Sequence, residues 1–273
     1  MIVITGATGN VGRAVTEQLA AAGRQVVAVS RNAPTSEPPA GVRHHVADLA
    51  DPASLTEALV GAQALFLLVA GDDPQGVLAV AAAAGVRHVV LLSSQGAGTR
   101  PEAYGHPVAF ERAVKESGMA WTVLRPGGFA TNTFQWIEGV RTRREVAAPF
   151  ADVALPPIDP ADIADVAVAV LTEEGHHGRT YELTGPRALS PRERAEVLAG
   201  ALGEPVRFVE QTRDEARAGL LHVMPEPVAD ATLAILGTPT PAEQAVGSDV
   251  ERILGRPART FADWAARHVA AFR

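Results

Sequence analysis

Met1-Ile2-Val3-Ile4-Thr5-Gly6-Ala7-Thr8-Gly9-Asn10-Val11-Gly12 is the stretch that decides the fold of this chain. Its first five residues are apolar or β-branched, which favours a short buried strand. Three glycines follow at intervals of three, and residues 13–23 then have the pattern of a helix that ends at a glycine. A strand, a glycine loop and a helix in this order predict a dinucleotide-binding unit.

Each glycine of the loop has a predicted task. Gly6 permits a tight turn after the strand, Gly9 lets the backbone approach a pyrophosphate, and Gly12 lets the helix pack against the sheet. The N–H groups of the first helical turn then face the phosphates. The residues expected to hold the pyrophosphate are Gly6, Thr8, Gly9, Asn10, Val11 and Gly12. A flavodoxin-like domain with a glycine-rich first loop and no cofactor is the alternative.

The end of the second predicted strand, residues 24–30, indicates which cofactor is bound. An acidic residue there binds the ribose 2′-hydroxyl of NAD, whereas an arginine can hold the 2′-phosphate of NADP. Arg31 stands at this point, about 20 residues after Gly12, as the motif requires. No Asp or Glu occurs between Glu17 and Glu37. We therefore predict NADP(H), with a solvated Arg31 at a strand end as the alternative.

Two further predicted strands end in residues that should reach the same edge of the sheet. The apolar run at 64–68 continues into Val69, Ala70 and Gly71, and the strand at 86–92 continues into Ser93 and Ser94. The carboxyl ends of parallel strands form the crevice in which doubly wound folds bind their ligands. We expect these residues to contact cofactor or substrate, although the two serines could equally form a simple turn.

Composition narrows the class of protein. The chain has 273 residues, a net charge of −7, 47% hydrophobic residues and no cysteine. It can bury a large core, and it lacks both disulfides and a thiol nucleophile. The negative charge and the absence of a Lys/Arg cluster argue against nucleic acid as the main partner. The first strand starts at Met1 and no apolar run is long enough for a bilayer, which predicts a cytoplasmic protein without a membrane partner.

These motifs resemble those of the atypical short-chain dehydrogenase/reductases. The loop at 5–12 is similar to the first motif of that group. The stretch HPVAFERAVKESGMAWTVLRPGGF at 106–129 is similar to the NmrA-like branch, and most similar to its NADPH:quinone oxidoreductase members. The resemblance covers about the first half of the chain, in order, at Gly6, Asp48, Ser93, Glu111 and Arg125.

The resemblance implies roles for several residues. Asp48 and Leu49, after the predicted strand at 42–47, would lie beside the adenine, and a serine at 93–94 would hydrogen-bond the reacting carbonyl. Asn132 would face the substrate cleft. The residues implied to border the nicotinamide are Pro126, Gly127 and Phe129.

The same resemblance predicts a Tyr-x-x-x-Lys pair, and here the chain departs from it. Tyr104 is followed four residues later by Val108, and residue 111 before Lys115 is not a tyrosine. The catalytic candidates are therefore Ser94, Tyr104 and His106, with water as a further source of the proton. The unperturbed pKa of a histidine lies near neutrality, which suits an acid, but a capping or surface role is the alternative for His106.

The predicted fold is α/β, a Rossmann-type, doubly wound and mostly parallel sheet with a small C-terminal substrate lobe. Residues 1–150 would form the NADP-binding domain, and 151–273 the last sheet elements and the lobe. Ser190–Glu193 and Thr212–Glu215 are predicted capping boxes that open two helices there. Phe134, Trp136 and Met224 are candidates for the lining of the lobe, with core packing as the alternative.

These observations predict an NADPH-dependent oxidoreductase that transfers hydride to a small-molecule acceptor. A quinone, an enone or a related flat acceptor suits a site without the Tyr/Lys pair, and the reaction could be a biosynthetic step. The alternative is a catalytically silent NADP(H)-binding redox sensor that acts through a protein partner. A monomer or a homodimer is expected.

Overall fold

A computed structural model describes residues 1–34 and 38–273, and in it the chain forms two compact units. Unit 1 comprises Met1–Pro126, Pro160–Glu182 and Arg252–Gly255. Unit 2 comprises Gly127–Asp159, Leu183–Glu251 and Arg256–Arg273. The division into two domains after residue 150 stays a prediction. The stretch 32–41, where three prolines predict a loop, lies partly outside the described residues.

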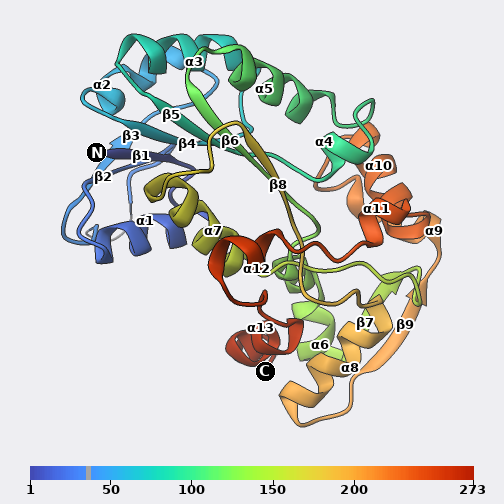
Figure 1. Ribbon diagram of the computed structural model, residues 1–273. Helices are drawn as coiled ribbons and strands as arrows, with labels where there is room; N and C mark the ends of the chain where they lie inside the picture. The colour runs from blue at the N-terminus through green and yellow to red at the C-terminus, as the bar shows by residue number, and fades with distance from the viewer. Residues whose placement is uncertain (35–37) are drawn as a thin grey trace. The chain divides into compact units, whose positions relative to one another are not determined.

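Unit 1 is built on a seven-stranded sheet with the order β3-β2-β1-β4-β5-β6-β8 (Figure 1). Every strand pair from β3 to β6 is parallel. The order reverses direction at β1, as in a doubly wound fold, which confirms the predicted α/β class. The strands are β1 (Ile2–Thr5), β2 (Val26–Ser30), β3 (Val42–Val46), β4 (Ala64–Leu68), β5 (His88–Leu92), β6 (Ala120–Pro126) and β8 (Arg179–Leu183).

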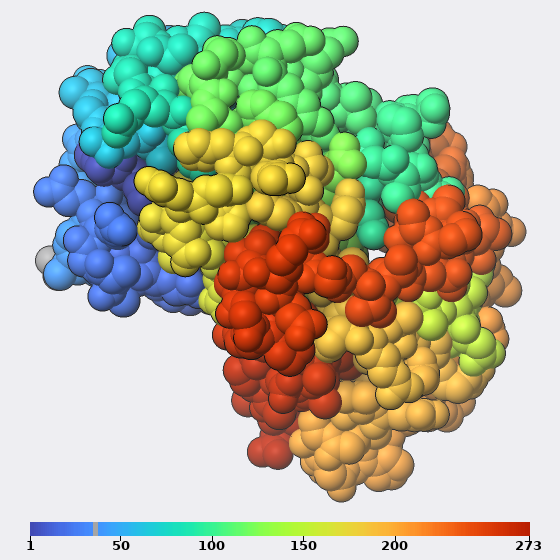
Figure 2. All heavy atoms as spheres, in the orientation of Figure 1, coloured from blue at the N-terminus to red at the C-terminus, as the bar shows by residue number. Residues whose placement is uncertain are grey.

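Helices cover both faces of this sheet. Figure 1 shows α1 and α7 on one side, and α3 and α5 on the other. Gln18 of α1 donates a hydrogen bond to Asp165 of α7 at 2.8 Å. The yellow atoms of α7 accordingly lie beside the blue atoms of α1 in Figure 2. The helical elements are α1 (Gly12–Ala21), η1 (Pro52–Leu55), α2 (Thr56–Leu59), α3 (Pro74–Ala83), α4 (Gly96–Thr99), α5 (Gly105–Glu116) and α7 (Pro160–Thr172).

The central strands are almost entirely buried, because a parallel sheet has helices on both faces. All residues of β1, β2 and β5 are buried. Thr5 is a polar member of this core, and its hydroxyl has partners on the next strand. It donates to the Phe66 carbonyl oxygen at 3.0 Å and accepts from the Leu68 N–H at 2.9 Å. These bonds connect the ends of β1 and β4, where the glycine loop begins.

Unit 2 has its own small sheet and its own core. β7 (Glu145–Pro149) and β9 (Arg207–Gln211) pair in parallel, and an aromatic cluster around the fully buried Trp264 packs nearby in the same core. None of the helices in the described ranges is both long and apolar enough to cross a membrane. The helical elements that lie wholly in unit 2 are η2 (Ala130–Trp136), α6 (Ile137–Arg143), α8 (Pro191–Leu202), α9 (Arg213–Leu220), α10 (Glu226–Gly237), α11 (Pro241–Gln244), α13 (Phe261–His268) and η3 (Val269–Phe272); α12 (Asp249–Leu254) runs from unit 2 into unit 1.

Candidate cofactor and active site

The glycine loop between β1 and α1 has no room for side chains at two positions. Gly6 has a φ of +63°, and a Cβ on it would lie 2.0 Å from the Leu68 Cδ1 atom. A Cβ on Gly12 would lie 2.3 Å from the Gly6 carbonyl oxygen. The atom met at Gly12 is backbone, and the positive φ at Gly6 disfavours any other residue, so both positions require glycine for the loop to keep its course. The turn at Gly6 agrees with the sequence pattern, whereas the close neighbour of Gly12 is the loop backbone and not the sheet.

The N-terminal end of α1 is left without a side-chain cap. Val11 occupies the N-cap position and makes no capping hydrogen bond, and the first turn holds no acidic residue. Thr8, Gly9 and Asn10 in front of it are exposed. A helix start of this kind presents backbone N–H groups and partial positive charge to an anion. The loop therefore has the features expected of a pyrophosphate site, and the predicted contacts of its residues stay predictions.

Three of the other predicted residues gather at the carboxyl edge of the sheet. A Cβ on Gly71 would lie 2.4 Å from the Leu49 carbonyl oxygen, so the two backbones are in close contact. The His106 Nε2 atom lies 2.6 Å from the Gly71 carbonyl oxygen. Because a carbonyl can only accept, Nε2 carries the hydrogen, and Nδ1 of the neutral ring is left as an acceptor. His106 thus belongs to the predicted crevice.

The remaining predicted cofactor residues lie at strand ends. Arg31 directly follows β2 and is exposed. Asp48 is exposed after β3, and its Oδ1 accepts the Ala50 N–H at 3.0 Å, which holds the turn beside the buried Leu49. Val69 and Ala70 are half-buried after β4. Their predicted contacts with the cofactor stay predictions.

The candidates Ser94 and Tyr104 both contact Gly96 of the short helix α4. The Ser94 Oγ accepts the Gly96 N–H at 3.2 Å. The Tyr104 ring lies against the same glycine, where a Cβ would come within 2.5 Å of the ring atoms. Both side chains thus border the loop after β5, which is the predicted substrate edge.

Ser93 belongs to a buried ionic network that sequence reasoning did not predict. The Ser93 hydroxyl donates to the Glu111 Oε1 atom at 2.7 Å. The Arg125 guanidinium forms two bonds with the same carboxylate, from Nε at 2.8 Å and Nη2 at 2.7 Å. Lys115 binds Glu111 Oε2 at 3.2 Å, and Arg125 also reaches Glu182 Oε1 at 3.2 Å. The network connects β5, α5, β6 and β8.

The electrostatics of this network make Glu111 an acceptor and not an acid. Burial alone would raise its pKa, but the hydrogen bonds and charge of Arg125, with the bonds from Ser93 and Lys115, outweigh burial and hold the pKa below its usual value. The Ser93 hydrogen and the Lys115 ammonium are therefore directed to Glu111. One signal in the sequence could have found the network: a charge, Arg125, directly after the apolar residues Val123 and Leu124 of a predicted strand.

The three residues implied to border the nicotinamide fall on both sides of the boundary between the units. Pro126 ends β6 in unit 1, and its carbonyl oxygen accepts the Gln95 N–H at 2.9 Å. Gly127 and Phe129 belong to unit 2. There the Gly127 N–H donates to the Leu183 carbonyl oxygen at 2.9 Å, and Phe129 pairs with Ile158. Their role stays a prediction.

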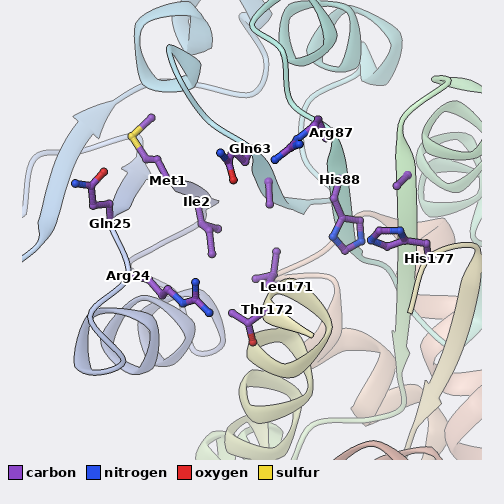
Figure 3. A pocket seen from close by; sticks show the side chains of 12 residues that line it. Met1, Ile2, Arg24, Gln25, Gln63, Arg87, His88, Leu171, Thr172 and His177 are labelled. Carbon is purple, nitrogen blue, oxygen red and sulfur yellow. The ribbon is translucent and has the colours of Figure 1, made fainter. Parts of the chain in front are cut away.

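A cavity of about 430 Å³ in unit 1 lies at the opposite edge of the sheet (Figure 3). It is lined by residues at the starts of strands, including Ile2 and His88. Figure 3 shows the His88 ring facing that of His177, and their centroids are 4.5 Å apart. Burial, with the nearby His177 and His176, lowers the pKa of His88 to about 4. This cavity therefore holds a neutral histidine and lies away from the glycine loop.

A larger cavity, of about 590 Å³, lies wholly within unit 2. Asn132, Trp136 and Met224, which the sequence analysis named as candidates for the substrate cleft or lobe, all line it. Phe134 does not line it and packs in the core, with its ring centroid 5.1 Å from that of Trp264. The alternative of core packing is thus the observed one for Phe134.

Comparison with known proteins places this site in a family. Residues 6–174 match the family described as NAD(P)H-binding. A reductase from Streptomyces griseus that acts on (4-alkanoyl-5-oxo-2,5-dihydrofuran-3-yl)methyl phosphate is 41% identical, over 100% of this chain and 99% of its own. An NAD(P)H azoreductase from Xenophilus azovorans is 36% identical, over 100% and 99%.

Solved structures agree with these relatives. The NADPH complex of a quinone oxidoreductase from Escherichia coli superimposes with a TM-score of 0.81 at 27% identity, over 98% of this chain and 99% of the other. NmrA, a negative transcriptional regulator solved with NADP, shares the fold with a TM-score of 0.78 at 18% identity, over 98% and 95%.

The fold, the open glycine loop and these likenesses define a class, the NAD(P)H-dependent reductases that use NADP(H) on small-molecule substrates. Within that class the chain belongs to the NAD(P)H-binding family, and it shares its fold with NmrA. The predicted family, cofactor and enzyme class are confirmed.

Proposed function

We propose that the chain reduces a flat, conjugated carbonyl acceptor, such as a quinone or an unsaturated lactone or ketone, with NADPH as the reductant. The observation that supports this proposal most directly is the hydrogen bonding of Ser93 and Lys115. Both are hydrogen-bonded to Glu111, which stands where the catalytic tyrosine of the larger group would precede its lysine. An acceptor that takes up hydride at a conjugated carbon needs little proton transfer in that step, so it suits such a site.

The names of the relatives support this substrate class. The Streptomyces griseus relative reduces an oxo-dihydrofuran, the Escherichia coli structure is a quinone oxidoreductase, and the Xenophilus azovorans relative is an azoreductase. A ketone or quinone conjugated to a double bond shares with an azo group a flat π-system that accepts hydride. NADPH supplies that hydride when bound.

In this proposal the chain positions the reactants and places one proton donor. The loop at 6–12 holds the pyrophosphate, and Arg31 holds the 2′-phosphate. His106 is held through Nε2 by the Gly71 carbonyl oxygen, and its imidazolium form, with a second hydrogen on Nδ1, can donate a proton to the acceptor oxygen. Ser94 and Tyr104, which both border Gly96, are the other candidates for this transfer.

The test is an assay of NADPH oxidation with a panel of quinones, enones and unsaturated lactones, beside calorimetric titrations with NADPH and NADH. We expect turnover with at least one class of acceptor and tighter binding of NADPH than of NADH. Tight binding of NADPH without turnover across the panel would contradict the proposed acceptors and favour a redox sensor. Absence of binding by either nucleotide would contradict the assignment of the glycine loop.

A further inference from the structure

The cavity in unit 2 contains a cation that no carboxylate neutralises among the residues that the structure describes. Arg194, the fourth residue of α8, lines this cavity, and its Nε atom is shielded from solvent without a hydrogen-bond partner. Burial alone lowers its pKa to about 10, with no acidic group contributing. A guanidinium whose Nε is buried without a partner is costly, so a protein that keeps one usually has a use for it.

The acidic residues of the same cavity do not account for Arg194. Glu145 is bound to Arg207, and the Glu215 carboxylate accepts the Thr212 N–H at 2.8 Å in a capping box. Glu138 also lines the cavity, but no ion pair connects it to Arg194 within the described residues. The charge of Arg194 is thus available to a ligand.

The surroundings of Arg194 are arranged for an anion. Its guanidinium lies over the Trp136 ring, 5.3 Å from the centroid, and a stacked guanidinium keeps its in-plane N–H donors for other partners. The Trp136 Nε1 atom is a second buried donor without an acceptor. These two unpartnered donors favour a bound oxyanion.

We propose that Arg194 binds a phosphate monoester carried by the acceptor, while the apolar wall of the unit 2 cavity holds the rest of that molecule. This inference rests on the proposed function, because it names the substrate class of the same enzyme. A phosphate matches the forked donors of arginine, and the charge-assisted bonds are strong where water is scarce. Met224 and Leu233 supply apolar surface for a flat or alkyl portion.

The experiment compares one acceptor in two forms: a five-membered unsaturated lactone with a hydroxymethyl arm, and its phosphate monoester. In Arg194→Met, we expect kcat/KM for the phosphorylated lactone to fall about 10- to 100-fold, the range of a lost charge-assisted contact. The value for the free lactone should not change. Arg194→Lys keeps the charge without the planar fork and should lose less than Arg194→Met.

Arg192→Gln is the matched control. Arg192 is on the same helix, but its partner is Asp152 at 2.9 Å and it does not line the cavity. It should leave both lactones unaffected. NADPH affinity should be equal in all variants, which separates a phosphate on the acceptor from the 2′-phosphate of the cofactor. Thermal unfolding should show Arg194→Met to be as stable as the parent or more so, because it removes a buried unpaired charge.

A calorimetric titration with the phosphorylated lactone, without NADPH, distinguishes the two ways of failing. If the parent enzyme reduces neither lactone but binds the phosphorylated one through Arg194, the proposed function fails and this inference stands. If Arg194→Met binds or reduces the phosphorylated lactone as well as the parent does, the role of Arg194 is refuted.

Discussion

The N-terminal ends of α1 and α8 differ in whether side chains cap their backbone N–H groups. At α8, the Ser190 Oγ accepts the Glu193 N–H at 3.2 Å, and the Glu193 carboxylate accepts the Ser190 N–H at 2.8 Å. At α1, Val11 stands in the capping position and contributes no side-chain hydrogen bond. The chain thus supplies its own acceptors at one helix and omits them at the other. From this difference we predict that the start of α1, and not that of α8, binds the cofactor phosphates.

Capping boxes also occur at other helices of unit 2. Three further helices there begin with a Thr whose hydroxyl and the acid three residues later form a reciprocal pair; they are α9, α11 and α13. A capping box satisfies two backbone N–H groups and is worth about 1 kcal/mol. Helices without a side-chain cap occur elsewhere too, for example α5, α6 and α10. At α1 the uncapped start directly follows the glycine loop, and we therefore expect an anion there.

Adding a side chain at the start of α1 should have the largest effect, a loss of NADPH affinity. A Cβ added by Gly12→Ala would meet the Gly6 carbonyl oxygen at 2.3 Å, so either the loop or the helix must move. We expect NADPH affinity to fall about 100-fold, equivalent to roughly 3 kcal/mol of strain and lost phosphate contact. Calorimetric titration measures this change.

Gly200→Ala in α8 is the matched control, because it is also a helical glycine but has open space at its Cβ position. It should leave NADPH binding unchanged and stabilise the fold by up to about 1 kcal/mol. Equal NADPH affinity in the Gly12→Ala variant and the parent would contradict the hypothesis that the start of α1 binds the cofactor phosphates.

The next effect concerns the choice between the two nucleotides. Arg31 is exposed directly after β2, beside the predicted cofactor crevice. Arg31→Ala should weaken NADPH binding about 10-fold or more and leave NADH binding unchanged, because only NADPH carries the 2′-phosphate. The exposed Arg43 of β3 provides the control substitution, Arg43→Ala. Equal losses for both nucleotides would exclude a specific role of Arg31.

Local patterns predicted the two helix ends well. The glycine spacing at 6–12 and the capping boxes at 190 and 212 depend on residues close together in the chain, and such rules can be read from sequence. The mostly parallel sheet follows from the alternation of strands and helices with the same ease. The confirmed fold and cofactor therefore rest on short-range signals.

Long-range pairing escaped prediction. Glu111 and Arg125 were known only as motif positions, because their mutual bonds depend on where a helix and a strand meet in space. Arg194 gave no signal at all: an arginine in a helix is usually solvated, and only the folded unit shows that its Nε is buried and unpartnered. The units also interleave along the chain, with Pro160–Glu182 returning to unit 1, which no local change in composition reveals.

Substitution of a side chain that lies at the carboxyl edge of the sheet but does not bind the cofactor should change turnover and leave cofactor affinity unchanged. His106 is held at the Gly71 carbonyl oxygen and should contribute to proton transfer, not to NADPH binding. We expect His106→Ala to lower kcat for a quinone about 10-fold, at the low end for a general acid because this acceptor needs little proton help. NADPH affinity should stay constant, and the exposed His222 gives the control, His222→Ala. Full activity in His106→Ala would remove this residue from the mechanism.

Removing the side-chain cap of α8 should have the smallest effect, and it should change only the stability of the fold. Ser190→Ala removes the acceptor for the Glu193 N–H and one half of the capping box of α8. The free energy of unfolding should fall by about 1 kcal/mol in denaturant titrations, with NADPH affinity unchanged. The same substitution at the N-cap of α1, Val11→Ala, removes no hydrogen bond, so any loss there reflects the buried valine side chain. If Ser190→Ala instead weakened NADPH binding while stability was retained, the two helix ends would not divide between fold and ligand, and α8 would belong to the cofactor site.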